Sequence, residues 1–330
     1  MNEKIDILMA TYNGEKYVAE QIESILNQTY KNIRLVISDD CSSDNTKNIL
    51  KKYEEKDERV KVFYQKQNLG YIKNFEFLLK QIENDIYMLS DQDDFWLPEK
   101  IEKTYKTLIE ENADLVFSDL EVVDSNLKTI YPSFNDFMLL TRKINKYINS
   151  YKANYLYNCV TGCTLMSRKK FIDKILPLPS KSRYVAHDHW IGIIVGLNGK
   201  LSYMPEKYIK YRQHDNNEIG TNKISHKFRK MQEVRKLFIE VKLGVFGTYV
   251  ENNQKFPKEL QQLNIQAYNY FKMVENKKRF NFKNWKVFNE LYKTETFMYY
   301  IENFLIMNMP FIANILFEIR HVILKLLRKR

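Results

Sequence analysis

The sequence predicts an α/β protein in which a doubly wound, mostly parallel sheet is followed by a helical extension. Two observations carry this prediction. Over the first 120 residues, short apolar runs rich in β-branched and aromatic side chains alternate with amphipathic helical patterns. From about residue 223 onward, only helical patterns remain. Because alternating strands and helices build parallel sheets with right-handed crossovers, we expect a sheet domain over residues 1–222 and a helical region over residues 223–330.

Each element of the sheet domain is expected from a local pattern. Strands are expected at residues 5–10, 34–38, 60–64, 86–90 and 115–119. Helices with one apolar face are expected at residues 18–27, 46–55 and 73–82. Asp44 is a plausible cap for the second of these helices. Beyond Asp124 we expect a loop and helix insertion over residues 130–160, strands at 161–167 and 207–211, and helices over 226–244, 258–276 and 284–304.

Composition narrows the class of protein. The chain has 330 residues, of which 44% are hydrophobic, so it can bury a sizeable core. Its three cysteines are an odd number without metal-site spacing, which predicts neither a disulfide framework nor a zinc site. The N-terminus runs directly into a strand pattern without the apolar region of a signal peptide, so we expect a cytoplasmic protein.

The net charge of +11 is concentrated in the last third of the chain. Residues 1–222 contain 31 Lys and Arg against 32 Asp and Glu, whereas residues 223–330 contain 21 against 9. This asymmetry indicates a polyanionic partner, either nucleic acid or an anionic membrane surface.

The end of the chain resembles an interfacial membrane helix. The apolar segment 304–317 is too short and too interrupted to span a bilayer, and from Pro310 onward apolar residues recur at helical spacing. The chain closes with the basic residues Lys325, Arg328, Lys329 and Arg330. We therefore expect peripheral association with the inner face of the cell membrane. The alternative is a core-packing or dimerising helix whose cations interact favourably with the helix dipole, and a homodimer would follow from it.

Three carboxylates lie within four residues, at Asp91, Asp93 and Asp94, directly after the apolar run 86–90. A strand that ends in this way presents oxygen atoms at the carboxyl edge of a sheet, where open α/β folds bind ligands. Hard cations such as Mg²⁺ and Mn²⁺ prefer oxygen ligands. The alternative is that one carboxylate caps a helix beginning near Pro98. Capping explains one carboxylate and not three.

Two more polar clusters follow the first two predicted strands. The cluster at residues 10–14 lacks the glycine spacing of dinucleotide-binding folds and of the P-loop, and a plain turn at Asn13-Gly14 is its alternative. The cluster at residues 38–44 contains Asp39 and Asp40, and a carboxylate there could accept a hydrogen bond from a base imide or a ribose hydroxyl. A capped turn is the alternative for this cluster.

Taken together, these clusters resemble glycosyltransferase family 2. The series consists of residues 10–14, residues 38–44, Asn68-Leu69-Gly70 and the segment 90–96 with the sequence Ser-Asp-Gln-Asp-Asp-Phe-Trp. The resemblance covers about residues 3–220 and is strongest to bacterial rhamnosyl- and hexosyltransferases of surface-polysaccharide synthesis. It implies a GT-A fold and an inverting transfer from dTDP-rhamnose or a UDP-hexose to a lipid-linked saccharide.

The resemblance also implies where the donor and its metal bind. Mn²⁺ or Mg²⁺ would neutralise the leaving diphosphate, with Asp93 in direct contact, Asp91 in support and His214 as a third ligand or phosphate contact. Contacts with the donor nucleotide are implied for Thr11, Tyr12, Asn13, Asp39, Asp40, Asn68, Asp91 and Arg212. The guanidinium of Arg212 suits a phosphate by its fixed fork of donors. Which of Asp39 and Asp40 contacts the base stays open.

The segment 184–190 resembles the family's base motif. Asp188 would take the proton from the acceptor hydroxyl as that hydroxyl attacks the anomeric carbon. The alternative for Asp188 is a helix cap. The acceptor or the transferred sugar is implied to contact Asp94, Trp96, Gly162, Cys163 and His187, and Asp94 is alternatively a helix cap.

Two other classes of protein compete with this interpretation. Sugar-nucleotide pyrophosphorylases need a Gly-rich, basic N-terminal loop, whereas residues 10–16 contain one Gly and no Arg. A nucleic-acid-binding protein would use the basic tail, whose cations alternate with aromatic residues. The ordered motifs upstream favour the transferase, so we expect a nucleotide sugar and a lipid-linked acceptor as partners, and no nucleic acid.

Overall fold

The computed structural model describes residues 3–138, 147–214, 231–276, 282–293, 297–309 and 312–313. Contacts within the chain divide it into two units. The first, here called the catalytic unit, consists of Met1–Lys181 and Ala186–Asn217, and the second, the helical unit, consists of Ser182–Val185 and Glu218–Arg330. The last boundary between the two units, between residues 217 and 218, lies a few residues before the boundary expected at residue 222. No sequence pattern marks residues 182–185 as part of the helical unit.

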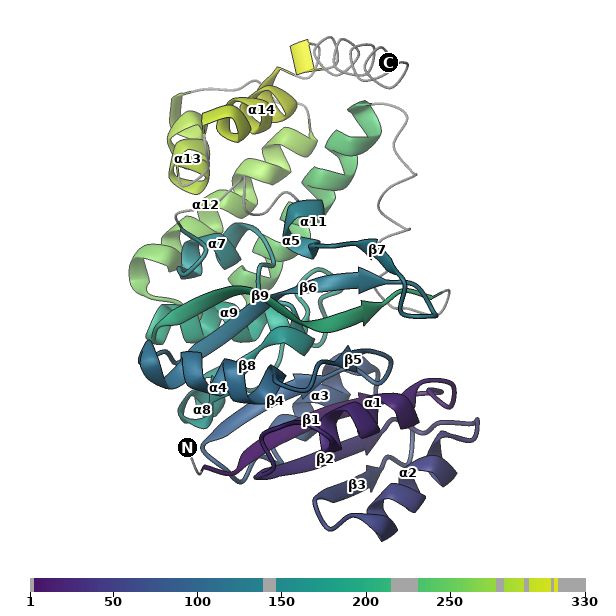
Figure 1. The fold of residues 1–330 in the computed structure, drawn as a ribbon. Coiled ribbons are helices and arrows are strands. Elements are labelled where there is room, and N and C mark those ends of the chain that lie inside the picture. Colours follow the sequence, from purple (N-terminus) through teal and green to yellow (C-terminus); the bar gives the residue numbers. More distant parts are fainter. Residues whose placement is uncertain are drawn as a thin grey trace. The chain divides into compact units, whose positions relative to one another are not determined.

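In the described part of the catalytic unit, nine strands form one sheet (Figure 1). They are β1 (Ile5–Thr11), β2 (Ile33–Asp39), β3 (Val60–Tyr64), β4 (Ile86–Ser90), β5 (Phe95–Trp96), β6 (Leu115–Val123), β7 (Thr129–Tyr131), β8 (Met166–Arg168) and β9 (Leu201–Arg212). The order is β3-β2-β1-β4-β8-β6-β9-β5, and β7 pairs with β6. Strands β1 to β4 are parallel, as are β6 and β9, whereas β5, β7 and β8 run antiparallel to their neighbours. The predicted α/β class with a mostly parallel sheet is confirmed.

The helices of the catalytic unit pack on this sheet, whose strands are apolar on both faces, or on one another. They are α1 (Val18–Leu26), α2 (Thr46–Lys56), α3 (Tyr71–Leu79), α4 (Lys100–Glu110), α5 (Phe134–Phe137), α7 (Tyr151–Leu156), α8 (Ile172–Ile175) and α9 (His187–Asn198). Alternate residues of β1, such as Ile5 and Ile7, join one core with Ile22 of α1, Leu50 of α2 and Leu108 of α4. Helix α3 packs against β1 and β2 without contributing to that core. Burial on both faces is typical of parallel sheets.

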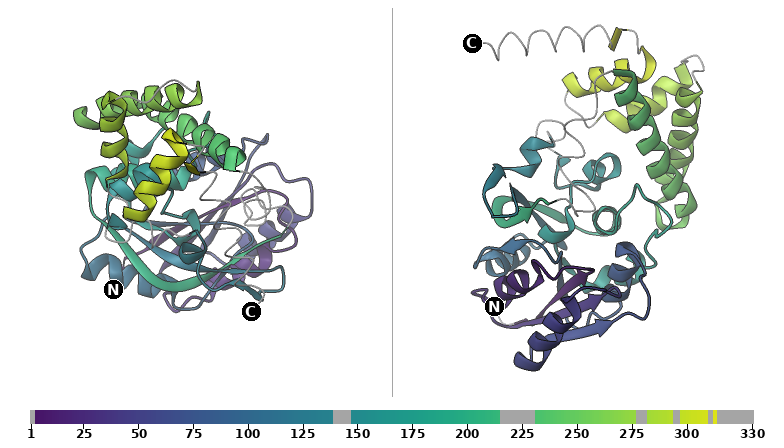
Figure 2. Two further views of the ribbon diagram at one scale, coloured as in Figure 1. Left: turned by 90° about the horizontal axis from the view of Figure 1, so that it is seen from above. Right: turned by 90° about the vertical axis from the view of Figure 1, so that its right-hand side faces the viewer.

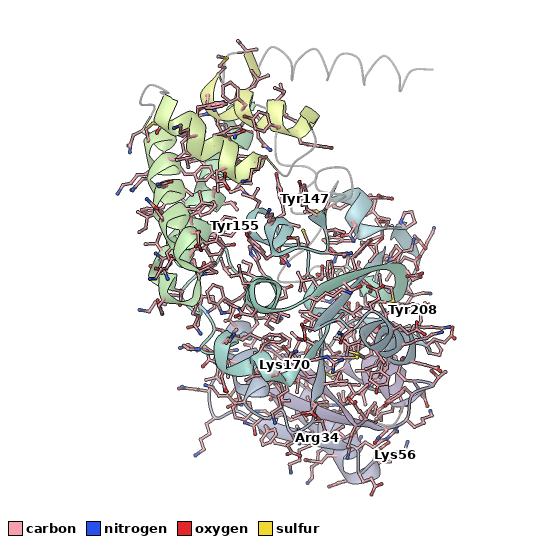
Figure 3. The ribbon with its side chains drawn as sticks, turned by 90° about the vertical axis from the view of Figure 1, so that its left-hand side faces the viewer. Arg34, Lys56, Tyr147, Tyr155, Lys170 and Tyr208 are labelled. Atoms are coloured by element: carbon pink, nitrogen blue, oxygen red, sulfur yellow. The ribbon has the colours of Figure 1, made fainter. Side chains whose placement is uncertain are left out.

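A buried ion pair joins β1 to β2 away from the carboxyl edge. Arg34, labelled in Figure 3, donates through Nε to Asp6 Oδ1 at 2.9 Å. Asp6 is fully buried and also accepts from the backbone N–H groups of Glu83 and Asn84 at 2.7 and 3.0 Å. These hydrogen bonds outweigh the opposing effect of burial and lower the pKa of Asp6. The carboxylate therefore fixes the loop before β4.

The structure corrects several predicted boundaries. The segment expected as a strand at residues 161–167 begins with a 3₁₀ helix, η2 (Gly162–Thr164), because the Gly162 N–H turns to bond a carboxylate, and only β8 is strand. Strand β9 is longer than expected and begins at Leu201. Asp94 does not cap a helix, because α4 begins at Lys100 after Glu99 and has no side-chain cap. Residues 139–146 of the expected insertion lie outside the described residues.

The helical unit contains α11 (Met231–Glu251), α12 (Lys258–Glu275), α13 (Phe282–Tyr292) and α14 (Phe297–Asn308). Figure 2 shows these helices, coloured green to yellow, and α12 packs against both α11 and α13. Their shared core is aromatic and includes Phe246, Tyr249, Tyr270, Phe271, Phe288 and Tyr292. No helix in the described ranges is long and apolar enough to cross a membrane. The basic helix expected from Pro310 onward lies outside the described residues, apart from Ile312 and Ala313.

Candidate active site at the carboxyl edge of the sheet

The sheet brings the predicted site residues to one edge. Strands β1, β2 and β4 are parallel and end at Thr11, Asp39 and Ser90, with Thr11 in register with Asp39 and Met9 in register with Ser90. Strand β9 runs parallel to β6 and ends at Arg212. The loops that follow these four strands contain the three predicted donor clusters and His214. Ligands of open α/β sheets bind at this edge.

Asp39 and Asp40 are both buried and both hold loops in place. Asp39 accepts from the Ser42 backbone N–H at 3.0 Å and from the Thr11 hydroxyl at 3.2 Å. Asp40 accepts from the backbone N–H groups of Leu69 and Gly70 at 2.7 and 2.9 Å, which fixes the loop that contains Asn68. An ionised carboxylate has about four acceptor positions, so each retains capacity for a further donor. The choice between the two for a base contact stays a prediction.

The loop after β1 is locked to the loop after β2. Asn13 adopts a left-handed conformation with φ of 47°, and its side-chain oxygen accepts from the Ser43 backbone N–H at 2.8 Å. Its own N–H donates to the Ser42 hydroxyl at 2.9 Å. Asn13 therefore links the two loops through its side chain and its backbone, while the side chain of the neighbouring Tyr12 is 49% exposed.

Gln92 links the same loop to the acidic cluster, the name used here for Asp91, Asp93 and Asp94. Its side-chain amide accepts from the Tyr12 backbone N–H at 2.9 Å and donates to the Tyr12 carbonyl at 3.0 Å. A Cβ at Gly14 would lie 2.2 Å from Gln92 Oε1, so the space that this contact needs exists because residue 14 is glycine. The turn predicted at Asn13-Gly14 is present, but the glycine serves close approach of a side chain 78 residues away in sequence.

The acidic cluster is a group of partly and fully buried acids. One ligand atom each from Asp91, Asp94 and Cys163 lies within 4.8 Å of the others. Burial, with the charges of Asp93 and Asp188 as smaller causes, raises the pKa of Asp91 to about 7. Burial also raises the pKa of Asp94 well above its ordinary value. Asp94 Oδ2 is enclosed without a nitrogen or oxygen partner among the described residues.

Asp93 faces a different partner. Its Oδ2 lies 2.8 Å from His214 Nε2, and the His214 ring stacks on Tyr17 with ring centroids 5.0 Å apart. The predicted metal ligands are thus present as an Asp93–His214 pair beside the group formed by Asp91, Asp94 and Cys163. Carboxylates, imidazole and thiolate are all possible ligands of a divalent cation, and oxygen predominates in sites for Mg²⁺ and Mn²⁺.

Arg212 is buried and holds the backbone of the acidic cluster by hydrogen bonds. The residue is 2% exposed, and its guanidinium donates to the Asp93 carbonyl at 2.8 Å, to the Ser125 carbonyl at 2.7 Å and to the Glu20 carboxylate. Its backbone N–H donates to Asp94 Oδ1 at 3.3 Å. These bonds hold the turn at residues 93–94, and a phosphate contact by Arg212 stays a prediction.

Lys100 is a buried cation that no sequence pattern indicates. It is 1% exposed, and its Nζ lies 3.6 Å from the centroid of the Trp96 ring, with no hydrogen-bond partner among the described residues. Burial lowers the pKa of Lys100 to about 7, against the opposing charges of Cys163 and Asp94. Trp96 is itself fully buried, so the structure places this predicted sugar contact in the interior beside Lys100. A lysine after Pro98-Glu99 resembles any helix start, which is why no sequence signal marked it.

Asp188 lies in the first turn of α9 and is 8% exposed. Its Oδ2 accepts from the Gly162 backbone N–H at 2.9 Å, and its Oδ1 accepts from Asn158 Nδ2 at 3.2 Å. The N-cap of α9 is Ala186, so Asp188 does not occupy the capping position. The charge of Asp188 is the smallest of the three causes that raise the pKa of Asp91, after burial and the charge of Asp93.

His187 and Gly162 complete this side of the site. The His187 ring stacks on Phe75 with centroids 3.9 Å apart, and neither ring nitrogen has a hydrogen-bond partner among the described residues. Burial lowers the pKa of His187, which favours the neutral ring. A Cβ at Gly162 would lie 3.0 Å from His187 Nε2 and 3.6 Å from Asp188 Oδ2. The absence of a side chain at residue 162 therefore leaves room for both.

Comparison with known proteins adds independent evidence. The family model described as Glycosyl transferase family 2 matches residues 6–174, about half of the chain. The dTDP-rhamnosyl transferase RfbG of Shigella flexneri is 29% identical over 240 residues, which are 69% of this chain and 79% of that protein. The UDP-Glc:alpha-D-GlcNAc-diphosphoundecaprenol beta-1,3-glucosyltransferase WfgD of Escherichia coli is 25% identical over 254 residues, which are 75% and 87% of the two chains.

A solved structure with the same fold is the mannosyltransferase PcManGT from Pyrobaculum calidifontis, determined in complex with GDP-Man and Mn²⁺. It matches with a TM-score of 0.55 at 12% identity and covers 88% of this chain and 75% of its own. At that identity the similarity concerns the fold, which is GT-A-like as the sequence predicted. With this fold, the carboxyl-edge site and a family match over residues 6–174, the protein belongs to glycosyltransferase family 2.

Proposed function

We propose that the protein is an inverting, metal-dependent glycosyltransferase that moves a sugar from a nucleotide-diphosphate donor to a hydroxyl of a lipid-linked saccharide. The observation that carries this proposal is the position of Asp188, a largely buried carboxylate whose charge acts on Asp91 of the acidic cluster. A base beside a cluster able to bind a cation is the arrangement that single-displacement transfer from a diphosphate needs.

The acidic cluster fits a divalent cation. Burial, and to a smaller extent the charges of neighbouring carboxylates, raises the pKa of Asp91 and of Asp94, and Asp94 Oδ2 is enclosed without a nitrogen or oxygen partner among the described residues. A cation would stabilise the charged form of such carboxylates. Asp93 and Asp91 would hold Mn²⁺ or Mg²⁺, with His214 as a further ligand or phosphate contact. When bound, the cation supplies the positive charge that neutralises the departing diphosphate. The presence of Mn²⁺ with GDP-Man in PcManGT supports this assignment.

The donor nucleotide would lie over the loops after β1 and β2. The exposed Tyr12 ring offers a face for the base or ribose, on a backbone that Gln92 fixes. Thr11, Asn13, Asp39, Asp40 and Asn68 would surround it. The names of RfbG and WfgD support dTDP-rhamnose and UDP-glucose respectively, so a dTDP-deoxysugar and a UDP-hexose are the two donors to test.

Asp188 is the residue of this chain that would take part directly in the transfer step. The acceptor oxygen forms a bond to the anomeric carbon as the bond from that carbon to the diphosphate oxygen breaks. Asp188 takes the proton that the acceptor hydroxyl loses, and attack from the opposite face inverts the anomeric centre. The Gly162 N–H and Asn158 Nδ2 orient this carboxylate. Gly162, Cys163 and His187 would border the acceptor.

A saccharide linked to a lipid diphosphate is the acceptor class we propose, within the synthesis of capsule, O-antigen or another cell-surface polysaccharide. WfgD is named for an acceptor carried on diphosphoundecaprenol. The excess of 12 positive charges in residues 223–330 would hold the protein at the cytoplasmic face of the membrane, peripherally and near such lipids. A homodimer through the same helices is the alternative use of this region.

The decisive experiment is Asp188→Asn. With a panel of nucleotide sugars and a lipid-diphosphate saccharide acceptor, we expect the variant to bind the donor with unchanged Kd and to lose transfer by at least about a hundredfold. Asparagine has nearly the same shape and can still accept from the Gly162 N–H. Transfer at the rate of the unmodified enzyme would show that another group is the base.

A further inference from the structure

The acidic cluster lies on backbone that belongs to no helix or strand. Residues 91–94 connect the end of β4 to the start of β5. In such a segment the positions of the carboxylates depend on the groups that hold the backbone N–H and carbonyl groups. Arg212 holds the Asp93 carbonyl at 2.8 Å. The carbonyl of Asp94 is held from a different element, helix α1.

Gln21 of α1 is the fully buried residue that reaches this carbonyl. Its side-chain Nε2 donates to the Asp94 carbonyl at 2.6 Å and to Ser24 Oγ at 3.0 Å. Its Oε1 accepts from Trp96 Nε1 at 3.1 Å and from Ser90 Oγ at 2.9 Å. The reverse orientation of the carboxamide would set an oxygen against the Asp94 carbonyl and a nitrogen against the Trp96 N–H. A carboxamide offers two donors and two acceptor positions, and all four are engaged here.

Two serines extend these bonds to both ends of the segment. Ser90 Oγ also lies 2.9 Å from the Asp91 carbonyl, so its proton is shared between that carbonyl and Gln21. Ser24 Oγ accepts from the backbone N–H of Trp96 at 3.2 Å. Gln21 is therefore linked to the chain before, within and after the acidic cluster.

The surroundings of Gln21 make these bonds selective for one geometry. Helix α1 packs against β5 and buries Val18, Ile22 and Ile25 as well as Gln21. A carboxamide among apolar side chains is costly to bury unless each polar atom has a partner. Hydrogen bonds are also stronger where water is excluded. The backbone of the acidic cluster is thus held in the one position that satisfies Gln21.

We propose that Gln21 is a positioning residue for the cation site. By fixing the carbonyls at both ends of residues 91–94, that of Asp94 directly and that of Asp91 through Ser90, it sets the geometry of the carboxylates between them. This inference rests on the proposed function, because it takes the acidic cluster as the site of Mn²⁺ or Mg²⁺. Trp96, implied by the resemblance to contact the sugar or the acceptor, acts here through its indole N–H, which orients the carboxamide of Gln21.

Gln28, two residues after α1, provides a matched control. It is also a fully buried glutamine, and its side chain donates to the Leu97 carbonyl at 2.8 Å and accepts from the Ile101 N–H at 3.1 Å. These bonds hold the chain beyond β5 and not the acidic cluster. We expect Gln21→Met to raise the Kd for Mn²⁺ at least about tenfold, and Gln28→Met to leave it within about twofold of the unmodified protein.

The Kd is measured by titrating the full chain with Mn²⁺ while UDP and dTDP are both present, with electron paramagnetic resonance reporting the free cation. No sugar is transferred in this experiment, so the result does not depend on activity. Thermal unfolding in chelator is recorded for both variants, because each loses buried hydrogen bonds and should unfold at a lower temperature than the unmodified protein. A merely structural role for Gln21 would give the two variants the same Kd for Mn²⁺, and that result would overturn the inference.

Trp96→Phe takes the place of Gln21→Met if that variant does not fold. It keeps an aromatic ring in the buried position and removes the indole N–H, so the carboxamide of Gln21 loses the bond that orients it. We expect the Kd for Mn²⁺ to rise about threefold, the effect of one hydrogen bond. An unchanged Kd would again show that Gln21 does not position the site.

Asp93→Ala separates this inference from the proposed function. If Asp93→Ala loses Mn²⁺ binding while Gln21→Met binds the cation as tightly as the unmodified protein, the role of Gln21 is wrong and the proposed cation site stands. If the unmodified protein binds no Mn²⁺, or if Asp93→Ala binds it equally tightly, the acidic cluster is not the cation site and both proposals fail.

Discussion

The side-chain amide of Gln92 bonds both backbone polar groups of Tyr12, at 2.9 and 3.0 Å. This pairing joins the loop after β1 to the acidic cluster after β4. The amide accepts from the N–H and donates to the carbonyl of one residue, as the backbone of a neighbouring strand does in a sheet. Gln92 stands among three carboxylates in sequence, yet its work is to fix the loop that would receive the base and ribose of the donor.

Removal of this amide should weaken donor binding. Gln92→Ala loses two hydrogen bonds that fix Tyr12, each contributing about 1 kcal/mol, so we expect the Kd for the nucleoside diphosphate to rise about tenfold. Isothermal calorimetry at constant Mn²⁺ concentration measures this. Gln81→Ala, which changes a glutamine outside the site loops, is the control and should leave the Kd unchanged. An unchanged Kd in Gln92→Ala would mean that the donor does not use this loop.

The acidic cluster should make the metal-free protein less stable as the pH rises. The pKa of Asp91 is about 7 in the folded state and near 4 when unfolded, so the folded state binds the extra proton between these values. Stability therefore falls as the pH rises from about 4.5 to 7, by an amount of order 2 kcal/mol. Thermal unfolding in chelator across this range checks the sign. With saturating Mn²⁺, or in Asp91→Asn, the fall should be smaller, and an equal fall would assign it to other groups.

Lys100 should oppose the binding of a cation to the cluster. Its buried ammonium carries a charge of the same sign near Asp94 and Cys163, and it has no hydrogen-bond partner among the described residues. Lys100→Met keeps the volume and removes that charge, so we expect Mn²⁺ to bind several-fold more tightly and the protein to become more stable by about 1 kcal/mol. Lys103→Met on the same helix, where the lysine is 44% exposed, is the control. Weaker Mn²⁺ binding in Lys100→Met would show that the lysine organises the ligands.

Arg235 should contribute to the stability of the helical unit. Its guanidinium donates to the Val274 carbonyl at 3.1 Å and to the Ile306 carbonyl at 3.0 Å, and so satisfies the C-terminal ends of α12 and α14. Arg235→Ala removes these hydrogen bonds from the ends of both helices and should cost about 1–3 kcal/mol. Denaturant unfolding followed by circular dichroism measures the loss. Its neighbour Lys236 is exposed, and Lys236→Ala should change stability by less than about 0.5 kcal/mol.

The sequence predicts those parts of the molecule that depend on local pattern. Strands β1 to β4 and the loops that follow them were expected because apolar runs end in polar clusters, and parallel strands bring such ends to one edge. The roles of Gln92 and Lys100 were not, because each is set by contacts distant in sequence: Gln92 bonds a residue 80 positions earlier, and Lys100 is buried beside Trp96 and Cys163. Gly162 was expected to contact the acceptor or the transferred sugar, and it also donates its N–H to Asp188.

The antiparallel course of β8 has a consequence for how specificity can be distributed. Because β8 runs against β4, with Met166 beside Met88 and Arg168 beside Ile86, its incoming loop reaches the edge at which its neighbours' outgoing loops lie. Gly162 and Cys163 arrive at the acidic cluster by that route. The loops proposed for the donor and those proposed for the acceptor thus enter one site from opposite chain directions and from separate stretches of sequence. On the proposed assignment, changes in residues 158–165 would alter the acceptor, while the loops proposed for the nucleotide remain as they are.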